Sequence, residues 1–123
     1  MVEIIEKELS YKIVGVLMKV HTTLGSGYQE KYYQRAVARG SMLQSIAYKE
    51  QLHIPLAYEG ESIGGYFVDF LIEDKIILEI KAPRTFYSRD YRQVRAYLKY
   101  ANLRLGILAN FGKQSLDYKR ILN

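Results

Sequence analysis

The sequence contains no cysteine, and this absence excludes disulfide scaffolds, thiolate metal sites and cysteine-based catalysis. It also lacks any stretch that approaches the ~20 consecutive apolar residues of a membrane-spanning helix. Its first residues do not combine a basic segment with a following apolar one, as a secretory signal peptide does. We therefore expect a cytoplasmic protein without a membrane partner. Only two prolines interrupt the chain, and it has no repeat, low-complexity tract or linker.

The remaining composition is that of an ordinary globular protein, with 123 residues of which 49% are hydrophobic and 25% charged. This length corresponds to one domain, so we expect residues 1–123 to form a single one. The net charge of +5 is a mild bias toward polyanions. The basic excess is concentrated in residues 84–99, which carry five arginines and lysines against one acid, Asp90.

Apolar spacing predicts helices at both ends of the sequence. Between Leu9 and Leu24 the apolar residues recur with a period of 3.6, and the glycines that follow would end an amphipathic helix. Similar patterns predict a second helix from Tyr28 to about Leu43 and a third from Tyr87 to about Ala101.

From Ser45 onward the apolar period changes to two, which is typical of β-strands. Two β-rich runs around a short polar turn at residues 73–75 predict a hairpin. The expected strands are residues 45–56, 66–72, 76–80 and 103–109, with a turn region at 60–65. This order of elements predicts an α/β fold with a mixed, largely antiparallel β-sheet flanked by helices.

The hairpin contains three polar residues where apolar ones are expected. Glu79 and Lys81 are two apart on one strand and share a face, and pairing about the turn brings Asp69 near them. Two carboxylates at one point suit Mg²⁺ or Mn²⁺, which can polarise a phosphate and lower the pKa of an attacking water. A solvent-facing Glu–Lys pair with an aspartate at an edge explains the same spacing, so both interpretations stay open.

The same residues resemble a known superfamily. Asp69, a nine-residue gap and then Glu79-Ile80-Lys81 resemble the PD-(D/E)xK nuclease pattern, and Gly27-x-x-Glu30-x-x-Tyr33 resembles the signature of the GxxExxY family within that superfamily. Further similar segments follow in the family's order, and they are residues 9–15, 24–25, 66–69, 73–82, 93–97 and 105–112.

This resemblance implies a restriction-endonuclease-like core. It also implies that Asp69 and Glu79 are metal ligands, that Lys81 is the catalytic lysine and that Glu30 is an acidic residue of the site close to the metal. From the residues alone, the better explanation of Glu30 is a solvated acid in the first turn of a helix, where the helix dipole favours it.

Gln93 and Tyr97 match a QxxxY motif that lies next to the active site of exonuclease-type members. They are four residues apart on one helix face, and an ordinary surface pair explains them about equally well. His21 borders the apolar stripe of the first helix, and we expect a buried, hydrogen-bonded histidine there rather than a metal ligand.

The basic segment is the candidate nucleic-acid interface. Arg89, Arg92 and Arg95 could follow phosphates, and the interleaved Tyr87 and Tyr91 could stack on bases. A solvated helix face explains the arginines equally well.

Together these observations predict a metal-dependent nuclease that hydrolyses phosphodiester bonds of nucleic acid, with DNA as the expected substrate. Asp69 and Glu79 would hold Mg²⁺ (or Mn²⁺), with Glu30 assisting, and Lys81 would orient or activate the water and stabilise charge on the phosphate. The alternative is a nucleic-acid- or partner-binding module on a nuclease fold with little or no turnover. A homodimer stays open, since it would enlarge a small binding surface.

Overall fold

The computed structural model describes residues 4–82 and 85–123. In these two ranges the chain forms three helices and five strands. They are α1 (Lys7–Leu24), α2 (Glu30–Leu43), β1 (Tyr48–Tyr58), β2 (Glu61–Ile72), β3 (Ile76–Lys81), α3 (Ser88–Ala101), β4 (Leu105–Asn110) and β5 (Asp117–Leu122). None of the helices in these ranges is long and apolar enough to cross a membrane.

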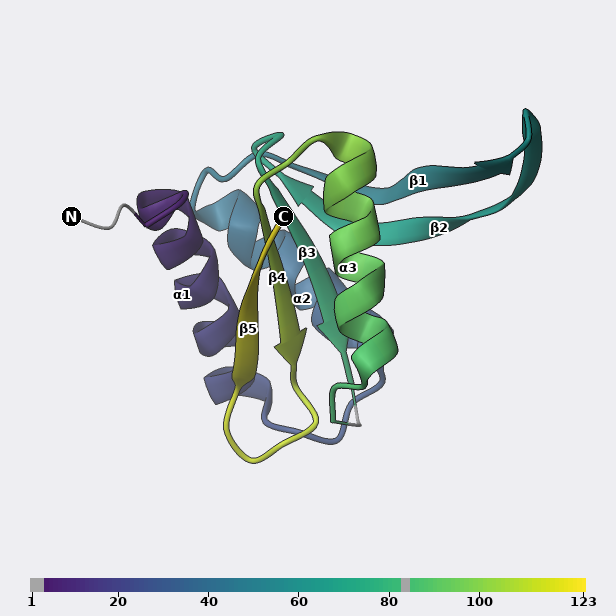
Figure 1. Cartoon of the computed structure of the whole chain (residues 1–123). Coiled ribbons are helices and arrows are strands. Elements are labelled where there is room, and N and C mark those ends of the chain that lie inside the picture. Colours follow the sequence, from purple (N-terminus) through teal and green to yellow (C-terminus); the bar gives the residue numbers. More distant parts are fainter. Residues whose placement is uncertain (1–3, 83–84) are drawn as a thin grey trace.

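The strands form one mixed sheet in the order β1-β2-β3-β4-β5. β3 and β4 run parallel, and the other three neighbouring pairs are antiparallel. A parallel pair needs a long crossover between its strands, and α3 supplies it. α1 and α2 cover one face of the sheet and α3 covers the other (Figure 1). The predicted α/β class, with a mixed sheet between helices, is therefore confirmed.

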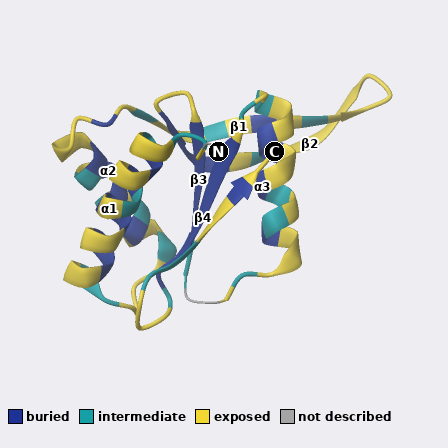
Figure 2. Ribbon diagram, turned by 60° about the vertical axis from the view of Figure 1, so that its left-hand side comes forward, coloured by how far each residue is buried: buried dark blue, intermediate teal, exposed yellow. Residues whose placement is uncertain are grey.

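Each face of the sheet has its own apolar core. On β3, Ile76, Leu78 and Ile80 pack with the helices α1 and α2, whereas Ile77 packs with α3. This alternation follows from the period of two along a strand, and it makes the central strands the most buried part of the molecule (Figure 2). Glu79 continues the odd positions of β3 and therefore projects to the α3 side of the sheet.

The prediction of a turn at residues 60–65 is wrong. The chain turns at Glu59 and Gly60, both with positive φ, and β2 begins at Glu61. The glycines further on serve a different purpose: a Cβ on Gly65 would lie 2.5 Å from His53 Nε2, so glycine allows β1 and β2 to approach there. β1 and β2 consequently form one long hairpin. Its outer end, residues 56–65, extends beyond the rest of the molecule, and we call it the arm (Figure 1).

The strand β5 was not predicted. It pairs with β4 at the edge of the sheet, and only Ile121 among its six residues is buried. An edge strand with one buried side chain does not produce the apolar alternation on which a sequence-based prediction depends.

Candidate active site

Asp69 and Glu79 lie where β2 and β3 separate. The β-ladder between these strands ends at the pair Phe70 and Leu78, so Asp69 and Glu79 would form the next pair. Instead, the backbone N–H of Asp69 donates to Glu79 Oε1 (2.9 Å), and the N–H of Ile80 donates to Asp69 Oδ2 (2.8 Å). The two carboxylates replace the missing ladder bonds. The hairpin therefore brings both acids to one point, as its sequence predicts.

The strand β2 is twisted at this point. Residues two apart on a strand normally share a face, but Val68 packs with α3 whereas Phe70 packs on the side of α1 and α2. On the neighbouring strand, Gln51 stands opposite with a φ of +52°, in the left-handed region. The local change of face aims Asp69 into the gap between the strands.

Burial governs the acidity of both carboxylates. Asp69 and Glu79 are 8% and 6% exposed. Burial, together with the charge of Asp69, raises the pKa of Glu79 to about 8. Burial raises the pKa of Asp69 too, and the charge of Glu30 adds to the increase. Lys81 opposes both shifts, and its Nζ lies 3.8 Å from Glu79 Oε2.

The helix α2 closes the site from the other side. Glu30, in its first turn, accepts a hydrogen bond from the backbone N–H of Ala82 just after β3 (3.0 Å). One turn later, Gln34 Nε2 donates to Asp69 Oδ1 (3.0 Å). Residues four apart share a helix face, which is why both reach the same gap. Gln34 was not predicted: its position four residues after Glu30 places it on the same helix face, but only the packing of α2 against the sheet brings it to Asp69.

Gly27 and Tyr33, the other two defining residues of the Gly27-x-x-Glu30-x-x-Tyr33 pattern, have structural roles. Tyr33 is fully buried, stacks on Phe111 with a centroid distance of 4.6 Å and donates its hydroxyl to the carbonyl of Gly25 (2.5 Å). Gly27 has a φ of +106°, which favours glycine. Tyr33 thus fixes the loop before α2, and the loop places Glu30 at the site.

Tyr97 on α3 belongs to the surroundings of the carboxylates. It is 3% exposed, and burial, with the charges of Glu79 and Asp69, raises its pKa. Its ring packs edge-on against Tyr66 with a centroid distance of 5.4 Å. Gln93, one turn earlier, is half-buried. A solvent-exposed pair therefore does not describe these two residues.

The donor set suits a divalent cation. Asp69 and Glu79 are buried acids beside one lysine, and once ionised they offer the hard oxygen ligands that Mg²⁺ prefers. Within residues 4–82 and 85–123, no group of three or more His, Cys, Asp or Glu side chains is gathered as a metal site. The described carboxylates could therefore offer two ligands at one point, and a metal held by Asp69, Glu79 and Glu30 stays a prediction.

Comparison with known proteins identifies the family. The family model of the PD-(D/E)XK nuclease superfamily matches residues 7–121. The chain belongs to the PD-(D/E)XK nuclease superfamily. A search of curated proteins finds no match.

Solved structures share the fold of this superfamily member. The crystal structure of an alkaline exonuclease from Laribacter hongkongensis matches with a TM-score of 0.56 and 14% identity over 100% of this chain and 72% of that one. The crystal structure of SSO0001 matches with a TM-score of 0.52 and 11% identity over 94% of this chain and 77% of that one. At these identities the similarity shows the fold alone.

The other predicted residues lie away from the carboxylates or on the surface. His21 is buried, with Nε2 2.9 Å from the carbonyl oxygen of Lys113, as expected for a structural histidine. The three arginines of α3 are exposed, and Arg89 lies over the ring of Tyr87 at 5.1 Å. Tyr91 is half-buried against Phe86, and Arg84 falls outside the described residues.

The raised pKa of Glu79 predicts a loss of stability toward alkaline pH. Between pH 4.5, the ordinary pKa of a glutamate, and about pH 8, the folded protein keeps the proton of the Glu79 carboxyl group, whereas the unfolded chain has released it. The stabilisation is full below about pH 4.5 and is lost as the pH rises through about 8. Glu79→Gln cannot ionise at this position. In metal-free buffer we expect its free energy of unfolding to rise relative to that of the wild type by a few kcal/mol toward pH 8.5, at about 1.4 kcal/mol per pKa unit.

Denaturant unfolding of both proteins between pH 5 and 8.5 measures this difference. The amide keeps an oxygen that can accept from the Asp69 N–H, so the comparison isolates the charge. A difference in the free energy of unfolding that does not change with pH would contradict the prediction.

Proposed function

We propose that this member of the PD-(D/E)XK superfamily is a metal-dependent nuclease that hydrolyses phosphodiester bonds, with DNA as the expected substrate. The observation that carries the proposal is the buried pair Asp69 and Glu79 with the ammonium group of Lys81 beside it. A structural hairpin gains nothing from two carboxylates of raised pKa in its core, because their burial costs free energy.

Asp69 and Glu79 would hold Mg²⁺ or Mn²⁺, and Glu30 would assist from α2. When bound, such a cation polarises the phosphate and lowers the pKa of a water. The chain's own groups orient the ligands: Gln34 and the Ile80 N–H each bind one oxygen of Asp69. Lys81, whose ammonium group stands next to Glu79, would orient the attacking water and stabilise negative charge on the phosphate.

The finer assignment to the GxxExxY family is part of the proposal. It is supported by the three residues that define the pattern. Gly27 adopts a positive φ, Glu30 accepts a hydrogen bond at the site, and Tyr33 is buried in the core. In this assignment Glu30 is a functional acid rather than a solvated one, and its hydrogen bond to the Ala82 N–H agrees with that.

A substrate panel tests the function. The protein is incubated with plasmid, linear duplex, single-stranded DNA and RNA, each with Mg²⁺, with Mn²⁺ and with a chelator. We expect hydrolysis that depends on the metal and stops with the chelator. Binding of nucleic acid without hydrolysis of any substrate would favour the binding module and overturn the proposal.

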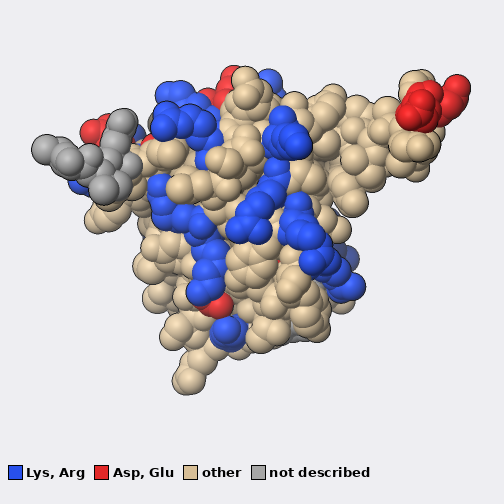
Figure 3. Space-filling view, in the orientation of Figure 1, with Lys and Arg blue, Asp and Glu red and all other residues tan. Residues whose placement is uncertain are grey.

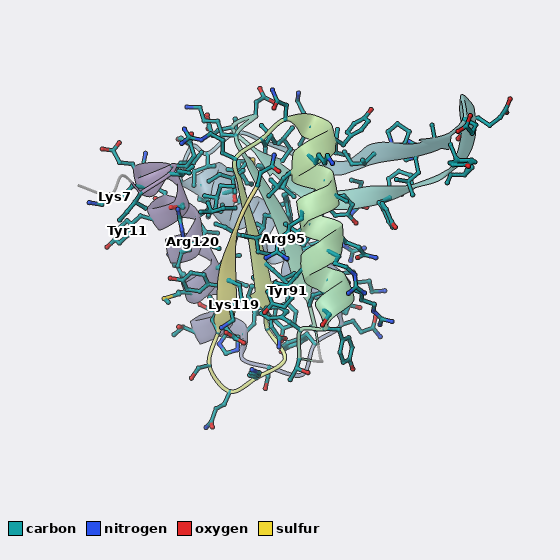
Figure 4. The ribbon with its side chains drawn as sticks, viewed as in Figure 1. Lys7, Tyr11, Tyr91, Arg95, Lys119 and Arg120 are labelled. Atoms are coloured by element: carbon teal, nitrogen blue, oxygen red, sulfur yellow. The ribbon has the colours of Figure 1, made fainter. Side chains whose placement is uncertain are left out.

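The arginines of α3 should determine how salt affects nucleic-acid binding. Tyr91 and Arg95 lie on the side of α3 that faces β5 in Figure 4, and basic side chains gather over this face of the molecule (Figure 3). Each phosphate contact that is lost should flatten the log–log salt slope by about 0.9 for duplex DNA. We expect a triple alanine variant of Arg89, Arg92 and Arg95 to have a flatter slope.

The single alanine variants of Arg89, Arg92 and Arg95 should flatten the salt slope to different extents, because positions six apart point in different directions on a helix. Replacing Lys31 and Lys75, exposed lysines on α2 and in the β2–β3 turn, is the matched control and should leave the slope nearly unchanged. A triple variant that keeps the slope of the parent places the nucleic acid elsewhere.

Gln34 should influence metal affinity without being a ligand. Replacing it with leucine removes the donor to Asp69 Oδ1 and leaves this oxygen free to turn. Loss of a group that orients a ligand typically costs 10–100-fold in metal affinity. Calorimetric titration with Mn²⁺ should show that decrease for Gln34→Leu, with Gln44→Leu, at the exposed end of α2, as control. Equal affinities in both variants would show that Gln34 does not orient Asp69.

A further inference from the structure

The arm of the β1–β2 hairpin leaves apolar side chains uncovered. Every residue from 56 to 65 except Leu56 is exposed, as Figure 2 shows at the outer end of the hairpin. Tyr58 and Ile63 are 68% and 64% exposed. Ile63 lies at a bulge, since β1 offers it no partner between Ala57 and Leu56. A two-stranded hairpin is marginal in water by itself, so such an end gains stability when another surface covers it.

The charge of the arm is opposite to that of the molecule as a whole. Residues 56–65 contain Glu59 and Glu61 and no lysine or arginine, which gives this tip a charge of −2 and leaves +7 on the remaining residues. Figure 3 shows the acids at the end of the arm, separated from the basic body. Two carboxylates repel phosphates, so this tip does not suit nucleic acid. It suits a basic surface with apolar side chains.

The chain carries a surface of that kind between α1 and α2. An apolar groove of about 530 Å³ runs between these helices, with Val16 and Val20 among its buried side chains and Leu43 exposed at its edge. Among residues 4–82 and 85–123, its charged lining residues are Lys12, Lys19 and Arg39, and none of these residues that line it is an acid. The helices can approach closely beneath the groove because Gly40 has no Cβ; one there would lie 2.8 Å from Val16.

We propose that the arm of one chain binds in the α1–α2 groove of a second copy, with Tyr58 and Ile63 against its apolar lining and Glu59 and Glu61 beside its three cations. The same chain cannot make this contact, because the arm points away from α1 and α2 in both Figure 1 and Figure 2. The two surfaces differ, so the contact is heterologous and repeats from copy to copy, either closing a ring or extending a chain.

Charge reversal in the isolated protein tests the proposal. Sedimentation velocity over a concentration series, without metal or nucleic acid, should show species above the monomer mass of 14.3 kDa for the wild type. Glu59→Lys with Glu61→Lys should weaken association about tenfold or more, because like charges then meet. Lys12→Glu with Lys19→Glu should do the same. All four side chains are exposed, so the fold should tolerate these changes.

Mixing the two variants should restore association, since the basic arm of one then meets the acidic groove of the other, and the unchanged acidic arm of the second meets the unchanged basic groove of the first. Lys31→Glu with Lys75→Glu changes the net charge as the groove variant does, at sites outside the groove, and should associate like the wild type. A monomeric wild type, reversals without effect, or a mixture that stays monomeric would each overturn the proposal. The nuclease assay does not enter this measurement, so the two proposals fail independently.

Discussion

Asp69→Asn should remove metal binding and hydrolysis together. The amide keeps the shape of the side chain and an oxygen that can accept from the Ile80 N–H, so the hairpin should fold. It removes one of the two buried carboxylates that meet between β2 and β3. Metal at a hundredfold excess over its dissociation constant should raise the free energy of unfolding of the wild type by about 2.7 kcal/mol, and that of the variant hardly at all.

Thermal unfolding with and without Mn²⁺, together with the substrate panel, measures both losses. Asp74→Asn is the matched control, because Asp74 is an exposed aspartate in the neighbouring turn, paired with Lys49 at 3.2 Å. It should respond to metal as the wild type does. Undiminished metal stabilisation in Asp69→Asn would remove this residue from the metal site.

The centre of the site could be predicted because it depends on local geometry. A short turn at residues 73–75 fixes the register of β2 and β3, and the register places Asp69 opposite Glu79. The period of two then places Lys81 beside Glu79. These steps need only the hairpin, and they are confirmed as geometry, whereas the chemical roles of the residues stay predictions.

Other parts depend on contacts between distant segments. Gln34 reaches Asp69 only because α2 packs across the sheet, and nothing in its own neighbourhood in the sequence indicates an aspartate 35 residues away. The arm was missed because Gly64 and Gly65 are usual in turns, whereas here they serve a bulge and a close approach to His53. Local propensity cannot distinguish these uses of glycine.

Lys81→Met should separate catalysis from metal binding. Lysine is a cation and does not ligate a metal, so removing its charge should leave Mn²⁺ affinity unchanged or slightly higher. Hydrolysis should fall on the order of 10²–10³-fold, the usual cost of losing one preorganised group that stabilises developing charge. Lys81→Arg should restore little, because a planar guanidinium does not replace a compact ammonium group.

Calorimetry and the rate of hydrolysis on the same preparations make this comparison, with the Asp69→Asn preparation showing the background from contaminating nuclease. Lys75→Met, at an exposed lysine before β3, should hydrolyse like the wild type. If Lys81→Met does so too, the lysine has no catalytic part. If it loses metal affinity together with turnover, its place beside Glu79 at 3.8 Å serves to hold that carboxylate for the metal rather than to act on the phosphate.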